Sequence, residues 1–382
     1  MKKSQPGIYI HIPFCHSKCG YCDFYSVTDL TSIHSFIDAL LNEIKLTSAY
    51  LNPSEIFDTI YFGGGTPSLL SNNQFKIIME SLKTYFNLSK DLNVTLEANP
   101  GTLDEQQLRG IITLGVNRLS IGFQSFIDKE LKLLNRIHTA VDNVESFSLA
   151  RSVGYEDISI DLIFALPNQT LENWKYSLDK AIGLKPEHIS VYNLTYEKGT
   201  PFYNLKEVGH LKPKDEENEL LFYITAIDKL KQNGYIQYEI SNFAQNPKLI
   251  SKHNIKYWNH TNYLGFGPSA HSLWQDKRWS NSTSINSYIK NLNEDKYPDR
   301  FEENINGKTK EFEKIFLSLR TISGINIPEF NKSFKCSFMD KYKKEVNELL
   351  NGGFARLTDK TIHLTSEGLY ICDEIVSNFA RI

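Results

Sequence analysis

The sequence lacks an apolar run long enough to cross a membrane. Its longest such stretch, "ISIDLIFALP", falls well short of the ~20 residues that a spanning helix needs. The N-terminal "MKKSQPG" has no apolar segment, so we expect no secretory signal. A formal net charge of −3 also lacks the basic footprint of a general nucleic-acid-binding protein. These absences predict a cytoplasmic globular protein that does not bind nucleic acid.

Cysteine is scarce and unevenly placed. The chain has five cysteines, and three of them lie in "CHSKCGYC", with the spacing C-x3-C-x2-C. An odd, clustered set argues against a disulfide framework and favours metal ligands. The two others, Cys336 and Cys372, stand alone, and we expect them to be buried apolar side chains.

The three clustered thiolates of Cys15, Cys19 and Cys22 allow two kinds of site. A structural zinc ion would need a fourth Cys or His, and the usual second half-site, a distant CxxC or HxxxH, is missing. His11 lies on an expected strand, and His16 directly follows Cys15. A [4Fe–4S] cluster held by three thiolates instead keeps one iron open for a small molecule. The spacing therefore favours a cluster over zinc.

The first two thirds of the chain alternate short β-branched runs with longer amphipathic runs. We expect strands at 7–12, 58–63, 93–98, 116–122, 156–164 and 188–194, and helices at 32–50, 71–86, 104–114, 139–153 and 171–184. This alternation predicts a parallel sheet with right-handed crossovers. Glycine and polar residues crowd the strand ends in "FGGGTP", "LEANPG" and "SIGFQS", where such folds place ligands.

The remaining segments have a different texture. A helix at 213–233 and a strand at 235–240 are expected, followed by an aromatic-rich stretch without clear periodicity. The polar segment 293–310 is typical of a linker, and helices are expected at 309–322, 338–351 and 365–380. The segment "GFARLTDKTIHLT" predicts two short strands like the wing of a winged-helix domain. We therefore divide the chain into a barrel (1–240), an aromatic-rich extension (241–300) and a C-terminal domain (301–382).

The segment "IYIHIPFCHSKCGYCDF" resembles the radical S-adenosylmethionine (SAM) superfamily, and within it the coproporphyrinogen III oxidase-like branch. The resemblance continues through "YFGGGTPSLL", "LEANPGTL", "GVNRLSIGFQSF", "LLNRIHT", "IDLIFALPNQT" and "GFGPSAHS". It implies an α/β fold, a partial (β/α)6 TIM-like barrel with a small C-terminal winged-helix-like α+β domain. It also implies a [4Fe–4S] cluster on Cys15, Cys19 and Cys22, SAM bound at the open iron, and an external electron donor.

The resemblance further implies a set of residues that contact SAM. They are Tyr9, Tyr21, Gly64, Gly65, Thr66, Glu97, Gln124, Arg136, Asp161 and Thr195, with the backbone of Phe266 and Gly267. Glycines leave the backbone bare for close approach, and the Arg136 guanidinium suits the SAM carboxylate. Asp161 interrupts an apolar strand and would need a polar partner such as a ribose hydroxyl. Core packing is an equal alternative for Tyr9 and Tyr21, and no catalytic residue is assigned.

Two functions compete within this branch. Members that decarboxylate coproporphyrinogen III with radical SAM chemistry carry C-x3-C-x2-C-x-C and a longer N-terminal arm, whereas Phe24 replaces the last cysteine here. The segment "HNIKYW" matches HNxxYW, the motif of HemW-type heme chaperones, and predicts heme contacts by His253, Asn254, Tyr257 and Trp258. Imidazole is a common heme ligand, although His253 could instead form hydrogen bonds within a loop.

We therefore expect a heme chaperone that binds a [4Fe–4S] cluster, SAM and heme and transfers heme to acceptor hemoproteins. The resemblance suggests membrane-bound cytochromes among the acceptors, with transient membrane contact. The alternative is an oxygen-independent coproporphyrinogen III oxidase. A winged-helix regulator with an iron–sulfur sensor is a third interpretation, which the near-neutral charge disfavours.

Overall fold

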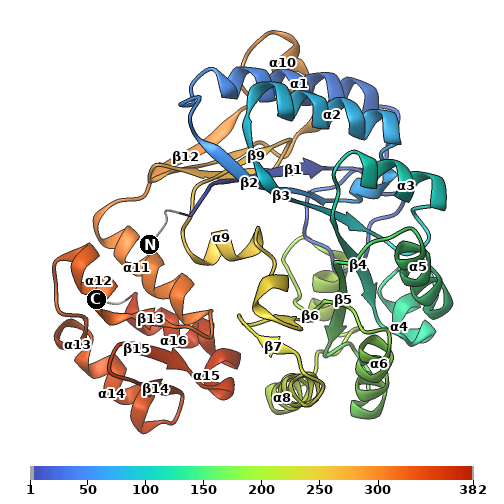
Figure 1. Ribbon diagram of the computed structural model, residues 1–382. Coiled ribbons are helices and arrows are strands. Elements are labelled where there is room, and N and C mark those ends of the chain that lie inside the picture. Colours follow the sequence, from blue (N-terminus) through green and yellow to red (C-terminus); the bar gives the residue numbers. More distant parts are fainter. Residues whose placement is uncertain (1–3, 381–382) are drawn as a thin grey trace.

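The computed structural model describes residues 4–380 and is built on a curved sheet of twelve strands (Figure 1). The strand order is β12-β11-β10-β9-β1-β2-β3-β4-β5-β6-β8-β7. No helix among residues 4–380 has the length and apolar character needed to span a membrane.

Six neighbouring parallel strands form the centre of the sheet, as predicted. They are β1 (Gly7–Ile12), β2 (Ile56–Gly64), β3 (Asn87–Ala98), β4 (Arg118–Gln124), β5 (Ile158–Phe164) and β6 (His188–Asn193). Each buries apolar side chains, such as Ile8, Leu96 and Ile160, which alternate along the strand with polar ones such as Thr59 and Ser120. The predicted parallel β/α fold is confirmed.

The predicted crossover helices are present on the outer face of this sheet (Figure 1). They are α1 (Ile33–Ser48), α2 (Asn72–Tyr85), α3 (Glu105–Thr113), α5 (Ala140–Ser152) and α6 (Leu171–Gly183). Capping boxes at Ser71, Asp104 and Thr139 set where α2, α3 and α5 begin. Two short elements were not expected, η1 (Pro67–Leu69) and α4 (Asp128–Leu133).

The sheet continues on the far side of β1 with strands that the sequence did not reveal. β9 (Tyr263–Phe266) pairs with β1 in parallel, and β10 (His271–Trp274), β11 (Lys277–Asn281) and β12 (Arg300–Asn304) follow in antiparallel pairs. The linker predicted over 293–310 is wrong, because β12 lies within it. Its polar residues are those of an edge strand, and Glu302 pairs with Lys277 across to β11 at 2.7 Å.

At the other end of the sheet, β6 pairs with β8 (Asn242–Ala244), and β8 pairs with β7 (Ile236–Gln237). The strand predicted over 235–240 is thus shortened to two residues by the turn into β8. The predicted helix over 213–233 is α8 (Glu216–Gln232), which Asp215 caps by accepting from the Asn218 backbone N–H. Shorter helices in these regions are α7 (Pro201–Glu207), η2 (Pro247–Leu249), α9 (Asn254–Trp258) and α10 (Ile285–Asn293).

The C-terminal part combines six helices with a three-stranded sheet of order β13-β15-β14. The helices are α11 (Gly307–Leu319), α12 (Ile327–Phe334), α13 (Phe338–Lys341), α14 (Lys343–Asn351), α15 (Ser366–Tyr370) and α16 (Cys372–Phe379). The strands are β13 (Ile325–Asn326), β14 (Ala355–Leu357) and β15 (Thr361–Leu364). The hairpin of β14 and β15 is the predicted wing, so the winged-helix-like arrangement is confirmed.

The lone cysteines differ in burial. Cys372 is buried, as predicted, but Cys336 is partly exposed and lies 3.9 Å from a Glu311 carboxylate oxygen. One apolar core runs from the barrel helices into the C-terminal part, so no gap in packing marks the predicted boundary at 300. The three-part division of the chain stays a prediction.

Candidate functional site

The cysteine-rich loop leaves the carboxyl end of β1 and folds back beside it. Backbone hydrogen bonds close the loop, from the Cys15 N–H to the Val27 carbonyl (3.0 Å) and from the Cys22 N–H to the Cys19 carbonyl (3.2 Å). All three thiols are free and partly exposed. The loop thus brings three unpaired thiols to the sheet edge where the sequence placed the site.

A chain of hydrogen bonds links two of these thiols through neighbouring strands. The Thr66 hydroxyl donates to Cys15 Sγ (3.4 Å), and the Arg136 guanidinium donates to Cys19 Sγ (3.6 Å). Asn99 joins the two donors, since its Nδ2 donates to Thr66 Oγ1 (3.1 Å) and its Oδ1 accepts from Arg136. Sequence reasoning missed Asn99, although it follows a strand end within the quoted "LEANPG".

The spacing of the three thiols is compatible with the cluster that the sequence predicts. Among residues 4–380, no group of three or more His, Cys, Asp or Glu side chains is close enough to hold one metal ion. Thiolates of a [4Fe–4S] cluster bind different irons, so they need not meet at one point. The neighbouring glycines pack tightly against the chain that enters this loop: a Cβ at Gly65 would lie 2.6 Å from the Phe14 carbonyl oxygen, and one at Gly64, where φ is +110°, would lie 2.6 Å from the His11 ring.

Four predicted SAM residues line the interior of the barrel. The side chains of Tyr9, Glu97 and Asp161 keep partial water access on the inner face of the sheet. Burial raises the pKa of Glu97 to about 7, although the Tyr61 hydroxyl donates to this carboxyl at 2.7 Å. Burial likewise raises the pKa of Asp161, which accepts from the Ser120 hydroxyl. Two carboxyl groups on this face of the sheet suit hydrogen-bond donors such as the ammonium and ribose hydroxyls of a ligand.

Strain and unpaired groups mark the same edge of the sheet. Gln124, the fourth of these residues, ends β4 with φ +67°, where the register with β5 shifts. Thr195 is exposed just beyond β6, between Asn193 and Tyr196. The Asn193 Oδ1 and Tyr196 hydroxyl are buried, and neither has a hydrogen-bond partner among residues 4–380. Unpaired buried polar atoms cost free energy, so their presence fits a ligand that would pair with them.

The two tyrosines for which core packing was an equal alternative differ. Tyr21 packs edge-on against Phe202 of α7 (ring centroids 6.2 Å apart), in a small apolar cluster apart from the main core. Tyr9 stacks on Tyr61 inside the barrel, with ring centroids 6.2 Å apart. Tyr21 also interacts with Cys19 and Arg136, and the Tyr9 hydroxyl is hydrogen-bonded to His11 Nδ1 at 3.1 Å. Contact of either tyrosine with SAM stays a prediction.

Comparison with known proteins identifies the family. Residues 9–181 match the radical SAM superfamily, and residues 305–371 match the HemN C-terminal domain. The chain is 36% identical to the heme chaperone HemW of Bacillus subtilis, over 97% of this chain and 98% of the relative. It is 35% identical to the heme chaperone HemW of Lactococcus lactis, over 99% and 98%. The chain belongs to the HemW family of radical SAM proteins.

A solved relative confirms the architecture of this HemW-family chain. Coproporphyrinogen III oxidase (HemN) from Escherichia coli superposes with a TM-score of 0.85, covering 99% of this chain and 90% of its own, at 23% identity. At that identity the likeness concerns the fold alone. Membership of the radical SAM superfamily implies a [4Fe–4S] cluster and SAM.

The HNxxYW residues of this HemW-family chain contact different parts of the protein. His253 and Tyr257, one helical turn apart on α9, contact each other beneath the barrel. Trp258 instead lies under the Arg320 guanidinium, 5.9 Å from its ring centroid, and Asn254 donates its backbone N–H to Ser251. Burial lowers the pKa of His253 to about 3, so its imidazole is neutral. Heme contact by these four residues stays a prediction.

Phe24, which occupies the position of the additional cysteine in the decarboxylases, is 68% exposed. Its side chain therefore contributes little to the core. Single exposed aromatics are ordinary on protein surfaces, so the exposure of Phe24 does not by itself indicate a contact.

Proposed function

We propose that this protein is a heme chaperone, which binds heme and transfers it to acceptor hemoproteins by means of a SAM-ligated [4Fe–4S] cluster. The observation that carries the proposal is the full-length similarity to two proteins named heme chaperone HemW. The three-cysteine loop and the polar side chains inside the barrel support the cofactor assignment.

In this proposal Cys15, Cys19 and Cys22 hold three irons, and the fourth iron binds SAM. When bound, the cluster supplies one electron at a time to SAM. Thr66 and Arg136 donate hydrogen bonds to the sulfur ligands. These bonds would stabilise the reduced cluster, which carries one more negative charge than the oxidised cluster. The backbone of Gly64 and Gly65 would contact the methionine end of SAM, while Glu97 and Asp161 would accept hydrogen bonds from its amino and hydroxyl groups.

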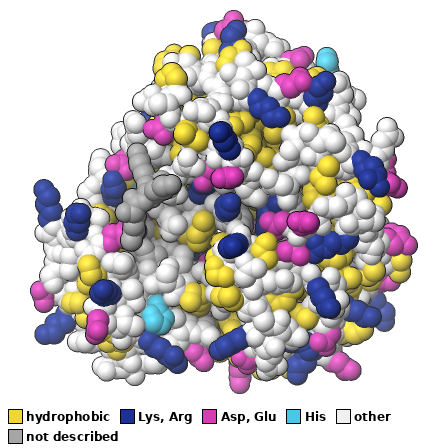
Figure 2. Space-filling view, in the orientation of Figure 1, with side chains coloured by type: hydrophobic (Ala, Val, Ile, Leu, Met, Phe, Trp, Pro, Cys, Tyr) yellow, Lys and Arg dark blue, Asp and Glu magenta, His cyan; other side chains and the backbone are white. Residues whose placement is uncertain are grey.

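The partners follow from the function. The protein would need an electron donor for the cluster, heme as cargo, and acceptor hemoproteins, among them membrane-bound cytochromes reached by transient contact. On the face that Figure 2 shows, acidic and basic side chains are interspersed.

The competing function, oxygen-independent decarboxylation of coproporphyrinogen III, has the structural likeness to HemN in its favour. At 23% identity, that likeness supports a shared fold but not a shared reaction. Phe24 replaces the fourth cysteine of the decarboxylase motif, and full-length relatives at 35–36% identity are named as chaperones.

A paired assay tests the proposal on one anaerobically reconstituted sample. We expect about four irons per chain, a heme Soret band, and heme transfer to an apo-cytochrome without decarboxylation of coproporphyrinogen III. Cys15→Ala, Cys19→Ala and Cys22→Ala should each lose the cluster. Robust decarboxylation, or a full iron complement in all three variants, would refute the proposal.

A further inference from the structure

The "HNIKYW" segment closes the end of the barrel opposite the cysteine loop. It packs against the first residues of β1 and β2. The contact at Gly7 is so close that any side chain at this position would clash. A Cβ there would lie 2.6 Å from Thr59 Oγ1 and 3.1 Å from His253 Cε1. The buried Lys256 anchors the segment, since its Nζ bonds Asp58 (2.6 Å) and the Gln5 carbonyl (2.7 Å).

His253 has no free nitrogen in this arrangement. Its Nδ1 is hydrogen-bonded to the Thr59 hydroxyl (2.9 Å) and its Nε2 to the Tyr257 hydroxyl (2.9 Å). The side chain is only 1% exposed. Ligation of a heme iron would break one of these bonds and open the packed end of the barrel.

The same imidazole supports the wall of the predicted SAM site. Its ring lies 5.2 Å from the ring of Tyr61, at 31°, and 6.4 Å from the ring of Tyr9. Tyr61 in turn donates its hydroxyl to Glu97 at 2.7 Å. A contact path therefore runs from α9 through Tyr61 to a carboxyl group predicted to bind SAM.

We propose that "HNIKYW" is a plug in which His253 positions Tyr61, and through it Glu97, for SAM binding, and that His253 does not ligate the heme iron. The inference rests on the proposed function only in taking Glu97 as a SAM contact. On this inference, the motif supports the binding of the cofactor SAM and does not ligate the iron of the cargo heme.

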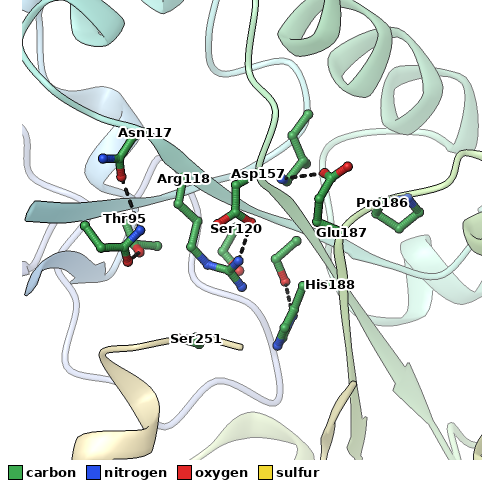
Figure 3. Close-up of polar contacts among 12 residues, drawn as sticks. Thr95, Asn117, Arg118, Ser120, Asp157, Pro186, Glu187, His188 and Ser251 are labelled. Carbon is green, nitrogen blue, oxygen red and sulfur yellow. Dashed lines mark hydrogen bonds and ion pairs between the residues drawn. The ribbon is translucent and has the colours of Figure 1, made fainter. Parts of the chain in front are cut away.

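The test compares matched variants of the reconstituted protein. His253→Leu removes both hydrogen bonds, while Tyr61→Phe removes only the hydroxyl that reaches Glu97. The control is His188→Leu, because His188 is also buried and bonded on both nitrogens, to Ser159 (2.8 Å) and Tyr238 (2.8 Å). It belongs to a separate polar cluster near Arg118 and Asp157, which Figure 3 shows.

Calorimetric titration with SAM across pH gives the first readout, and the heme Soret band gives the second. We expect His253→Leu to weaken SAM binding about tenfold, as Tyr61→Phe does. Its pH profile should also shift upward, because a displaced Tyr61 hydroxyl no longer favours the ionised Glu97. The groups facing that carboxyl are the Gly64 backbone N–H, Tyr9, Tyr61, Tyr257 and Asp161. The Soret band should stay unchanged, and His188→Leu should alter neither readout.

Wild-type SAM affinity together with a lost Soret band in His253→Leu would overturn the inference. If His253→Leu does not fold, Thr59→Val and Tyr257→Phe each remove one partner hydroxyl and should weaken SAM binding. Unchanged SAM affinity in both variants would also overturn the inference. Failure of the wild-type protein to bind heme would instead refute the proposed function and leave the SAM comparison intact.

Discussion

At the scale of single residues, Asn99 holds the two sides of the cysteine site together. It bonds Thr66 on one side and Arg136 on the other, and each of these donates to a cysteine sulfur. Groups that orient and hydrogen-bond the ligands of a metal centre tune its affinity and potential. Because one amide connects donors to two different thiolates, its loss should affect both.

We predict that Asn99→Leu accelerates loss of iron from the reconstituted protein by at least about tenfold. Leucine is close in volume but offers no polar partner, so Thr66 and Arg136 lose the group that fixes them. Transfer of iron to a ferrous chelator, followed by absorbance, measures the rate. Asn42→Leu is the control, since Asn42 bonds the Leu292 carbonyl far from the cysteines. Wild-type iron retention in Asn99→Leu would show that Asn99 does not organise the site.

At the scale of elements, the buried carboxylate of Glu43 ties α1 to the added part of the sheet. It accepts hydrogen bonds from the Gly267 N–H (2.8 Å), the Tyr288 hydroxyl (2.7 Å) and the Asn281 amide (2.7 Å). The Arg300 guanidinium lies 3.3 Å away and supplies the opposite charge. Glu43 therefore joins α1, the end of β9, β11, α10 and β12 at one point.

We predict that Glu43→Ala lowers the free energy of unfolding by about 3–5 kcal/mol, because it leaves Arg300 and three polar donors buried without their partner. Glu43→Gln should cost less, since one amide oxygen still accepts. Denaturant unfolding of the chain measures the difference. Glu80→Ala on the exposed face of α2 should change stability by no more than about 0.5 kcal/mol. An equally small effect of Glu43→Ala would contradict the assigned role.

At the scale of the whole molecule, the C-terminal part is fastened to the β7–β8 turn. The Ile240 N–H donates to the Arg320 carbonyl (3.1 Å), and the Ile322 N–H donates to the Tyr238 carbonyl (3.2 Å). Between these bonds, the Glu239 side chain is 2% exposed. Burial raises the pKa of Glu239 from 4.5 to about 7, against the hydrogen bonds that it accepts.

This junction should make stability depend on pH. Between pH 4.5 and 7 the folded protein binds more protons at Glu239 than the unfolded chain does, so the stability contributed here falls as pH rises. The loss approaches about 3 kcal/mol above pH 7, at about 1.4 kcal/mol per pKa unit. Denaturant unfolding measures the free energy of unfolding of Glu239→Gln minus that of wild type. This difference should be more favourable to the variant at pH 8 than at pH 5. An equal difference at both pH values would exclude Glu239 as the cause.

Patterns within short stretches of sequence were sufficient to predict the central parallel strands and the loop that carries the three cysteines. In the six parallel strands, buried apolar side chains such as Ile10, Ile121 and Ile160 recur at alternate positions, which is the period of a β-strand. The strands β9–β12 escaped notice because edge and antiparallel strands mix polar with apolar residues, and their pairing depends on β1 being free on one side. Asn99 escaped for a related reason: its two partners come from other strands and loops.

The sequence by itself determined the parallel α/β architecture, the three-thiol loop and the family resemblance, because each depends on local spacing and periodicity. Only the tertiary structure decided what surrounds each polar side chain. It paired Asn99 with two sulfur-binding donors, buried Glu239 at a junction, and bonded both nitrogens of His253 to residues 194 and 4 positions away. Most of these contacts join segments distant in sequence, and burial there sets protonation and accessibility in ways that no local pattern records.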